Sequence, residues 1–135
     1  MVTKLDIHTH KQGLYDITSH LRTLIHESGV REGLCTLFIQ HTSASLIVQE
    51  NADSSAQFDL EHWIQRLVPE GDRHYTHTLE GPDDMPAHIR SALTDTSISI
   101  PIMDNELMLG RWQGVFVWEH RRGGTIRHVA VHIGE

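Results

Sequence analysis

Histidine is unusually abundant in this sequence, with twelve among 135 residues, several times its ordinary share. Imidazole is the commonest protein metal ligand and the main acid or base near neutral pH. His41 ends a predicted strand, His77 lies in a polar loop closed by glycine, and His88 lies on a predicted helix. Three histidines from different elements, with water at a fourth position, are typical of an open zinc site. We therefore predict that His41, His77 and His88 bind a divalent metal ion, zinc or magnesium.

The same histidines allow a plainer interpretation. Their spacing matches no sharp zinc motif such as His-Glu-x-x-His. His41 shares a strand face with Cys35, Leu37 and Ile39, and a polar ring on an apolar face needs a hydrogen-bond partner or a ligand. Taken alone, His41 fits a hydrogen-bonded core histidine better than a metal ligand. The metal prediction therefore requires the three rings to converge on one cavity.

A second candidate pair, Glu119 and Arg127, lies on the last two predicted strands. Arg127 shares its strand face with Val129, Val131 and Ile133, which places a charge on an apolar face. Such a charge needs a carboxylate or an anionic ligand. The residues alone favour a structural ion pair and a catalytic role equally.

The apolar pattern also predicts the elements that must position these side chains. Strands are expected at residues 5–10, 34–41, 44–49, 97–102, 106–109, 114–120 and 125–133. Helices are expected over 15–28, with Gly29 as the stop, and from a cap at 53–55 to residue 67. A third helix should start at 83–86, with a carboxylate cap and then proline in the first turn, and run to residue 93. A turn at residues 122–124 should make the last two strands a hairpin. We predict one α+β domain, residues 1–135, with a mixed, largely antiparallel sheet or sandwich of about seven strands and two or three helices.

Composition limits the classes of partner. Eleven Lys and Arg against eighteen Asp and Glu give a formal net charge of −7, which argues against nucleic-acid binding. No apolar run is long enough to cross a membrane and no leader peptide is recognisable. One cysteine, Cys35, excludes an internal disulfide. We expect a cytoplasmic protein, and strands that are apolar on both faces predict a homo-oligomer.

Three groups of residues together resemble the YjbQ family, also called UPF0047. They are the segments 40–46 with 50–53, 75–77 with 80–81 and 84–88, and 109–114 followed by Glu119. The sequence departs from the family signature at Asn105, where glycine is usual, and at Arg111, where threonine is usual. Asparagine tolerates a positive φ, so we expect Asn105 to keep the turn.

The resemblance implies an α+β fold in a trimer, with sites near subunit boundaries. It also implies a thiamine-phosphate synthase activity, in which a pyrimidine pyrophosphate and a thiazole phosphate are joined and pyrophosphate is released. Asp53, Glu119 and Asn51 are then candidates for catalysis. The substrate-binding candidates are Thr42, Ser43, Arg111, Trp112, Gln113 and Arg127, with the metal at the three histidines.

The expected function is therefore a small metal-assisted enzyme that acts on a phosphorylated substrate. A trimeric protein that binds a phosphorylated metabolite without turnover is the first alternative. A structural or metal-buffering protein, whose histidines serve only as ligands, is the second.

Overall fold

The computed structural model describes all residues from 1 to 135. It contains three helices and eight strands, and every paired strand runs antiparallel to its neighbours. The elements are β1 (Val2–His8), β2 (Gly13–Asp16), α1 (Thr18–Ser28), β3 (Gly33–Ile39), β4 (Ala44–Glu50), α2 (Ser54–Leu67), α3 (Asp84–Leu93), β5 (Ser97–Met103), β6 (Glu106–Leu107), β7 (Gln113–Glu119) and β8 (Ile126–Gly134). The predicted α+β class and antiparallel pairing are confirmed.

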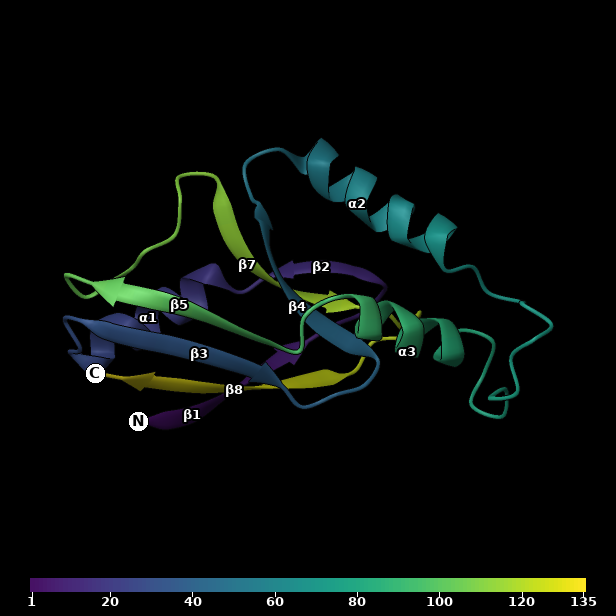
Figure 1. The fold of residues 1–135 in the computed structure, drawn as a ribbon, viewed down its shortest axis with the longest axis horizontal. Helices are drawn as coiled ribbons and strands as arrows, with labels where there is room; N and C mark the ends of the chain where they lie inside the picture. Colours follow the sequence, from purple (N-terminus) through teal and green to yellow (C-terminus); the bar gives the residue numbers. More distant parts are fainter.

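The strands form two sheets that together enclose the core (Figure 1). The larger sheet has the order β1-β8-β3-β5-β6, and the smaller has the order β2-β7-β4. Alternate residues of β3, namely Cys35, Leu37 and Ile39, are buried, whereas Leu34 and Phe38 on the other face are exposed. This is the period of two that a half-buried strand requires.

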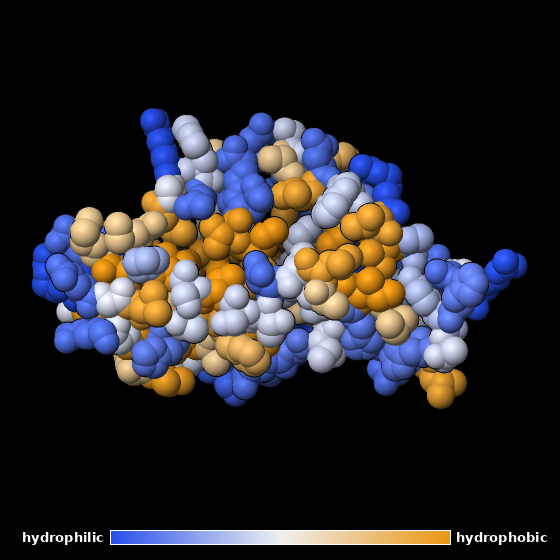
Figure 2. Space-filling view, in the orientation of Figure 1, coloured by the Kyte–Doolittle hydropathy of each residue, from blue (hydrophilic) through white to orange (hydrophobic).

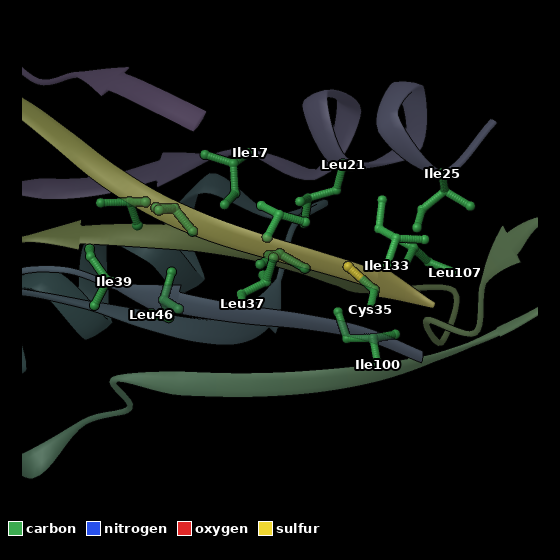
Figure 3. Close-up of a cluster of buried hydrophobic side chains, with 14 of the residues drawn as sticks. Ile17, Leu21, Ile25, Cys35, Leu37, Ile39, Leu46, Ile100, Leu107 and Ile133 are labelled. Atoms are coloured by element: carbon green, nitrogen blue, oxygen red, sulfur yellow. The ribbon is translucent and has the colours of Figure 1, made fainter. Parts of the chain in front are cut away.

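Helix α1 closes the core against the strands. Leu21 and Ile25 are fully buried one turn apart and, with Ile17, point toward Leu37 and Ile133 (Figure 3). Each such side chain contributes about 1.5–3 kcal/mol when it leaves water. Gly29 ends α1 with a φ of 69°, the left-handed conformation that glycine adopts without a steric penalty.

The prediction that the last two strands form a hairpin is wrong. β7 belongs to the smaller sheet and β8 to the larger one, so residues 120–125 carry the chain from one sheet to the other. A Cβ at Gly124 would collide with the carbonyl oxygen of Thr9, and Thr9 donates its backbone N–H to Thr125. β8 crosses to the larger sheet because it pairs there with β1 and β3. No local sequence pattern encodes this long-range pairing.

Two other expectations are corrected. Residues 13–16 form strand β2, paired with β7, instead of lying wholly outside the strands or beginning α1. Asp83 precedes α3, but its carboxylate makes no capping hydrogen bond. It accepts instead from the Arg121 Nε at 2.9 Å and from the Arg122 backbone N–H at 3.0 Å.

Helix α2 contacts the smaller sheet along one narrow face. Among its fourteen residues only Ile64 is buried, and Phe58, Trp63 and Leu67 are exposed. Figure 1 shows α2 above the smaller sheet, and Figure 2 shows hydrophobic residues in a band across the displayed face and in a group near the helices. By contrast, both faces of β7 are buried within the single chain, including Phe116 and Trp118. None of the three helices has the length and apolar character needed to span a membrane.

Candidate metal centre

Three potential metal ligands meet at the start of α3. The ligand atoms of His77, Asp84 and His88 all lie within 4.8 Å of one another. Asp84 Oδ2 lies 2.6 Å from His77 Nε2 and 3.0 Å from His88 Nε2. Asp84 and His88 are four residues apart on α3, which puts them on one helix face, and the loop before α3 supplies His77. This set offers two nitrogens and one oxygen.

Hydrogen bonding fixes the orientation of the His88 ring. Its Nδ1 lies 2.9 Å from the carbonyl oxygen of Thr42, and a carbonyl only accepts, so Nδ1 carries the hydrogen. In the neutral ring, the Nε2 lone pair therefore faces the Asp84 carboxylate. Two lone pairs at 3.0 Å repel unless a proton or a cation lies between them. A ring oriented by a backbone carbonyl is also the usual support of a metal-binding histidine.

Asp84 is almost completely buried, at 2% exposure, and remains ionised. Burial raises the pKa of its carboxyl, but the interactions with His77 and His88 and the charge of Arg121 outweigh that effect and hold the pKa below its usual value. Arg121 Nη1 donates to Asp84 Oδ1 at 2.7 Å. The carboxylate therefore presents one oxygen to Arg121 and the other to the two histidines.

His41, which we predicted as the third metal ligand, does not belong to this cluster. Asp84 is the third potential ligand instead. The His41 Nε2 accepts the backbone N–H of His128 at 2.8 Å, and its Nδ1 lies 3.2 Å from Arg127 Nη1. Burial and the neighbouring charges of Arg127 and His128 lower the pKa of this imidazole. Because both ring nitrogens face donors within the chain, neither points to the metal cluster.

Glu119 and Arg127 form a buried ion pair across the two sheets, with exposures of 1% and 4%. Arg127 donates from Nε to Glu119 Oε1 at 2.8 Å and from Nη2 to Oε2. Glu119 also accepts the Thr9 hydroxyl at 2.7 Å and the Arg121 backbone N–H at 3.1 Å. Four donors occupy its carboxylate, so the structure gives Glu119 the role of holding Arg127 in position.

The remaining predicted residues lie at the opposite end of β4. Ala44 pairs with Glu119, whereas Glu50 pairs with Gln113, and seven residues of strand span about 20 Å. Asn51, Asp53, Arg111, Trp112 and Gln113 therefore lie far from the metal cluster within one chain. Asp53 caps α2 by accepting the Ser55 backbone N–H at 2.9 Å, and the Arg111 guanidinium lies 4.7 Å from the Trp112 ring.

Thr42 and Ser43 lie beside the cluster. With His41 and His88 they line an open pocket of about 690 Å³. Its other lining residues are Phe38, Ile39, Gln40, Ser91, Ala92 and Thr96. The metal cluster thus lies at the edge of a cavity large enough for a small organic substrate.

Comparison with known proteins places the chain in a family. The family described as UPF0047 protein YjbQ-like matches residues 3–135. A UPF0047 protein from Synechocystis is 54% identical over 129 residues, covering 96% of this chain and 88% of that protein. The YjbQ protein of Escherichia coli O157:H7 is 38% identical, with 97% and 96% covered. The chain belongs to the YjbQ (UPF0047) family.

Solved structures agree with the YjbQ assignment. A conserved hypothetical protein from Thermus thermophilus superimposes with a TM-score of 0.88 at 32% identity, covering 98% of this chain and 99% of that one. A YjbQ/UPF0047 protein from Clostridium acetobutylicum superimposes with a TM-score of 0.86, also at 32% identity, with 99% of each chain covered. The fold of this chain is therefore the YjbQ fold.

Sequence reasoning missed Asp84 and Arg121 in this YjbQ-family site. Asp84 could be explained as part of a helix start. The signal that could have identified it is its position four residues before His88, which places both side chains on one helix face. Arg121 lies 37 residues from Asp84, so no local signal connects them. Asn105 keeps the positive φ expected of it, at 61°.

Proposed function

We propose that this YjbQ-family protein is a small metal-assisted enzyme that acts on phosphorylated substrates. The reaction proposed is thiamine-phosphate synthesis, which joins a pyrimidine pyrophosphate to a thiazole phosphate and releases pyrophosphate. The observation that carries the proposal is the His77–Asp84–His88 cluster, in which the Thr42 carbonyl directs the His88 Nε2 lone pair toward Asp84.

The donor set favours zinc over magnesium. Two imidazole nitrogens and one carboxylate oxygen, with a position open to water or substrate, are typical of catalytic zinc, whereas magnesium prefers oxygen ligands. His77, Asp84 and His88 would hold the ion, and Arg121 would orient the Asp84 carboxylate through its other oxygen. A bound divalent cation supplies charge neutralisation for a departing pyrophosphate.

The chain's own residues supply binding and orientation in this proposal. The open pocket beside His88 offers the Thr42 and Ser43 segment and the apolar side chains of Phe38 and Ile39. A ring-shaped substrate resting there would be positioned next to the cluster, which lowers the barrier by fixing the reacting groups.

We also propose that the protein works as a cytoplasmic homotrimer. Leu34 and Phe38 on the outer face of β3 and Phe58, Trp63 and Leu67 on α2 are exposed apolar residues, which a partner copy would cover. The net charge of −7 and only two lysines support a small-molecule partner in place of nucleic acid. Light scattering coupled to size exclusion should give three times the 15.4 kDa chain mass; a monomer would contradict this assembly.

Metal content tests the centre directly. Wild-type protein should bind one zinc ion per chain, and Asp84→Asn should weaken zinc binding by more than about a hundredfold, since even indirect supports of a metal ligand contribute 10–100-fold. Asp59→Asn, on the exposed face of α2, is the matched control and should keep full affinity. Equal zinc affinity in wild type and Asp84→Asn would refute the metal centre.

Turnover is tested separately. Zinc-loaded protein in excess over the two thiamine precursors should form thiamine phosphate and pyrophosphate in a single turnover, and Asp84→Asn should not. Binding of either precursor without product would instead support the binding-protein alternative. Zinc binding with neither precursor bound would support the metal-buffering alternative.

A further inference from the structure

A second pocket, lined by polar residues and glycines, lies beside the metal cluster. Its volume is about 290 Å³, and no hydrophobic residue and no carboxylate line it. The lining residues are Ser43, Arg121, Gly123, Gly124, Thr125 and Arg127. Their side chains offer two guanidinium groups and two hydroxyls. A pocket surrounded by hydrogen-bond donors is suited to an anion.

The backbone of the β7–β8 crossover adds two donors. The N–H groups of Gly123 and Gly124 donate to no acceptor within the chain. The flanking N–H groups are anchored, that of Arg122 to Asp83 Oδ2 at 3.0 Å and that of Thr125 to Thr9 Oγ1 at 3.2 Å. Because Gly123 and Gly124 line the pocket, their two unpaired N–H groups are available to an anionic ligand.

Hydrogen bonds within the chain hold both arginines in position, and each arginine has one N–H group left unpaired. A guanidinium has five N–H bonds. Arg121 uses four of them, on Asp83, Asp84 and the Glu80 carbonyl. Arg127 uses three on Glu119 and the Ser43 carbonyl, and a fourth faces His41. One Nη1 hydrogen of each arginine therefore has no partner in the chain.

The contact between Arg127 and His41 leaves one donor without an acceptor in the chain. A neutral imidazole has one acceptor nitrogen, yet the His128 backbone N–H and Arg127 Nη1 both face His41. The ring satisfies only one of these two donors. An anionic oxygen beside Arg127 would satisfy the other.

We infer that the pocket formed by Ser43, Arg121, Arg127 and the 123–125 loop binds the phosphate or pyrophosphate group of the substrate. This inference rests on the proposed function for its choice of ligand. Arg121 contacts both this pocket and Asp84, so it links anion binding to the metal. Without a metal, the two negative charges of Asp83 and Asp84 exceed the single positive charge of Arg121. A divalent cation on Asp84 makes the local net charge positive, so metal binding strengthens anion binding.

Calorimetric titration of the full-length protein with inorganic pyrophosphate tests this site without requiring turnover. Zinc-loaded wild type should bind pyrophosphate at least tenfold more tightly than metal-free protein. Arg121→Gln should weaken binding to the zinc-loaded protein at least tenfold. Arg122→Gln removes the same charge one residue away, where the guanidinium pairs with Glu70 outside the pocket, and should change affinity less than twofold.

A second variant separates the pocket from the metal. A Cβ at Gly123 meets no atom within 4 Å, so Gly123→Leu should fold and retain zinc while its side chain obstructs the pocket. It should lose pyrophosphate binding at least tenfold. Full pyrophosphate affinity in Gly123→Leu and Arg121→Gln, or none in zinc-loaded wild type, would overturn the inference. If zinc fails to bind but pyrophosphate binds through Arg121, the metal centre and the coupling are wrong and the anion pocket stands.

Discussion

Replacing His120 by glutamine should remove part of the acid sensitivity of folding. His120 is 1% exposed, and its Nε2 lies 2.9 Å from the Ser45 hydroxyl. Burial, followed by the nearby positive charges of Arg90 and Arg127, lowers the pKa of this imidazole from 6.5 to about 3. Glutamine keeps a hydrogen-bonding side chain there but does not titrate.

The size of the effect follows from the difference between the folded and unfolded pKa. Because the folded pKa is the lower one, the unfolded chain takes up a proton first, and stability decreases as the pH falls from 6.5 toward 3. At pH 5 the unfolded imidazole is protonated and the folded one is not. Each pKa unit corresponds to about 1.4 kcal/mol, so the loss between pH 7 and pH 5 is about 2 kcal/mol.

Urea unfolding at pH 7, 6 and 5, at one protein concentration, measures this difference. Wild type should lose about 2 kcal/mol more than His120→Gln between pH 7 and pH 5. His20→Gln, an exposed position on α1, is the control and should follow wild type. Parallel pH profiles for wild type and His120→Gln would show that His120 is not neutral and buried, and would refute the reasoning.

Two further substitutions separate structural from catalytic roles among the predicted residues. Asp53→Ala removes the α2 cap and should lower the free energy of unfolding by about 1 kcal/mol, with unchanged zinc affinity. The control, Asp59→Ala on the same helix, should lower it less. Loss of zinc binding in Asp53→Ala would contradict a purely capping role. Glu119→Gln leaves Arg127 charged and buried and should cost about 3–5 kcal/mol in urea unfolding. A loss below about 1 kcal/mol, the range of an exposed pair, would show that the pair is not desolvated.

Local patterns predicted most of the elements because local physics determines them. The Gly29 stop of α1 and the Asp53 cap of α2 are set by neighbouring residues, and both are as expected. Strand β2 was missed because its four residues, Gly13–Asp16, acquire strand structure by pairing with β7, a hundred residues along the chain. The supposed hairpin failed for the same reason, since β8 finds its partners in β1 and β3.

The site was predictable in part. His77 and His88 were recognised by residue type and setting, and the structure brings them together. Asp84 was overlooked as a ligand because a carboxylate in the first turn of a helix has an ordinary structural explanation. Arg121 and Asp83 meet only because the crossover between the sheets passes α3, and this depends on tertiary structure that spacing does not reveal.

The length of β4 determines which pairs of inactive variants could complement each other. One small molecule cannot touch His88 and Trp112 of the same chain, because a strand of about 20 Å separates the two ends. If the Trp112 end serves the reaction, it must do so for a neighbouring protomer. Co-expressing two inactive chains, one altered at each end, would then restore activity in mixed assemblies, whereas two chains altered at the same end would stay inactive.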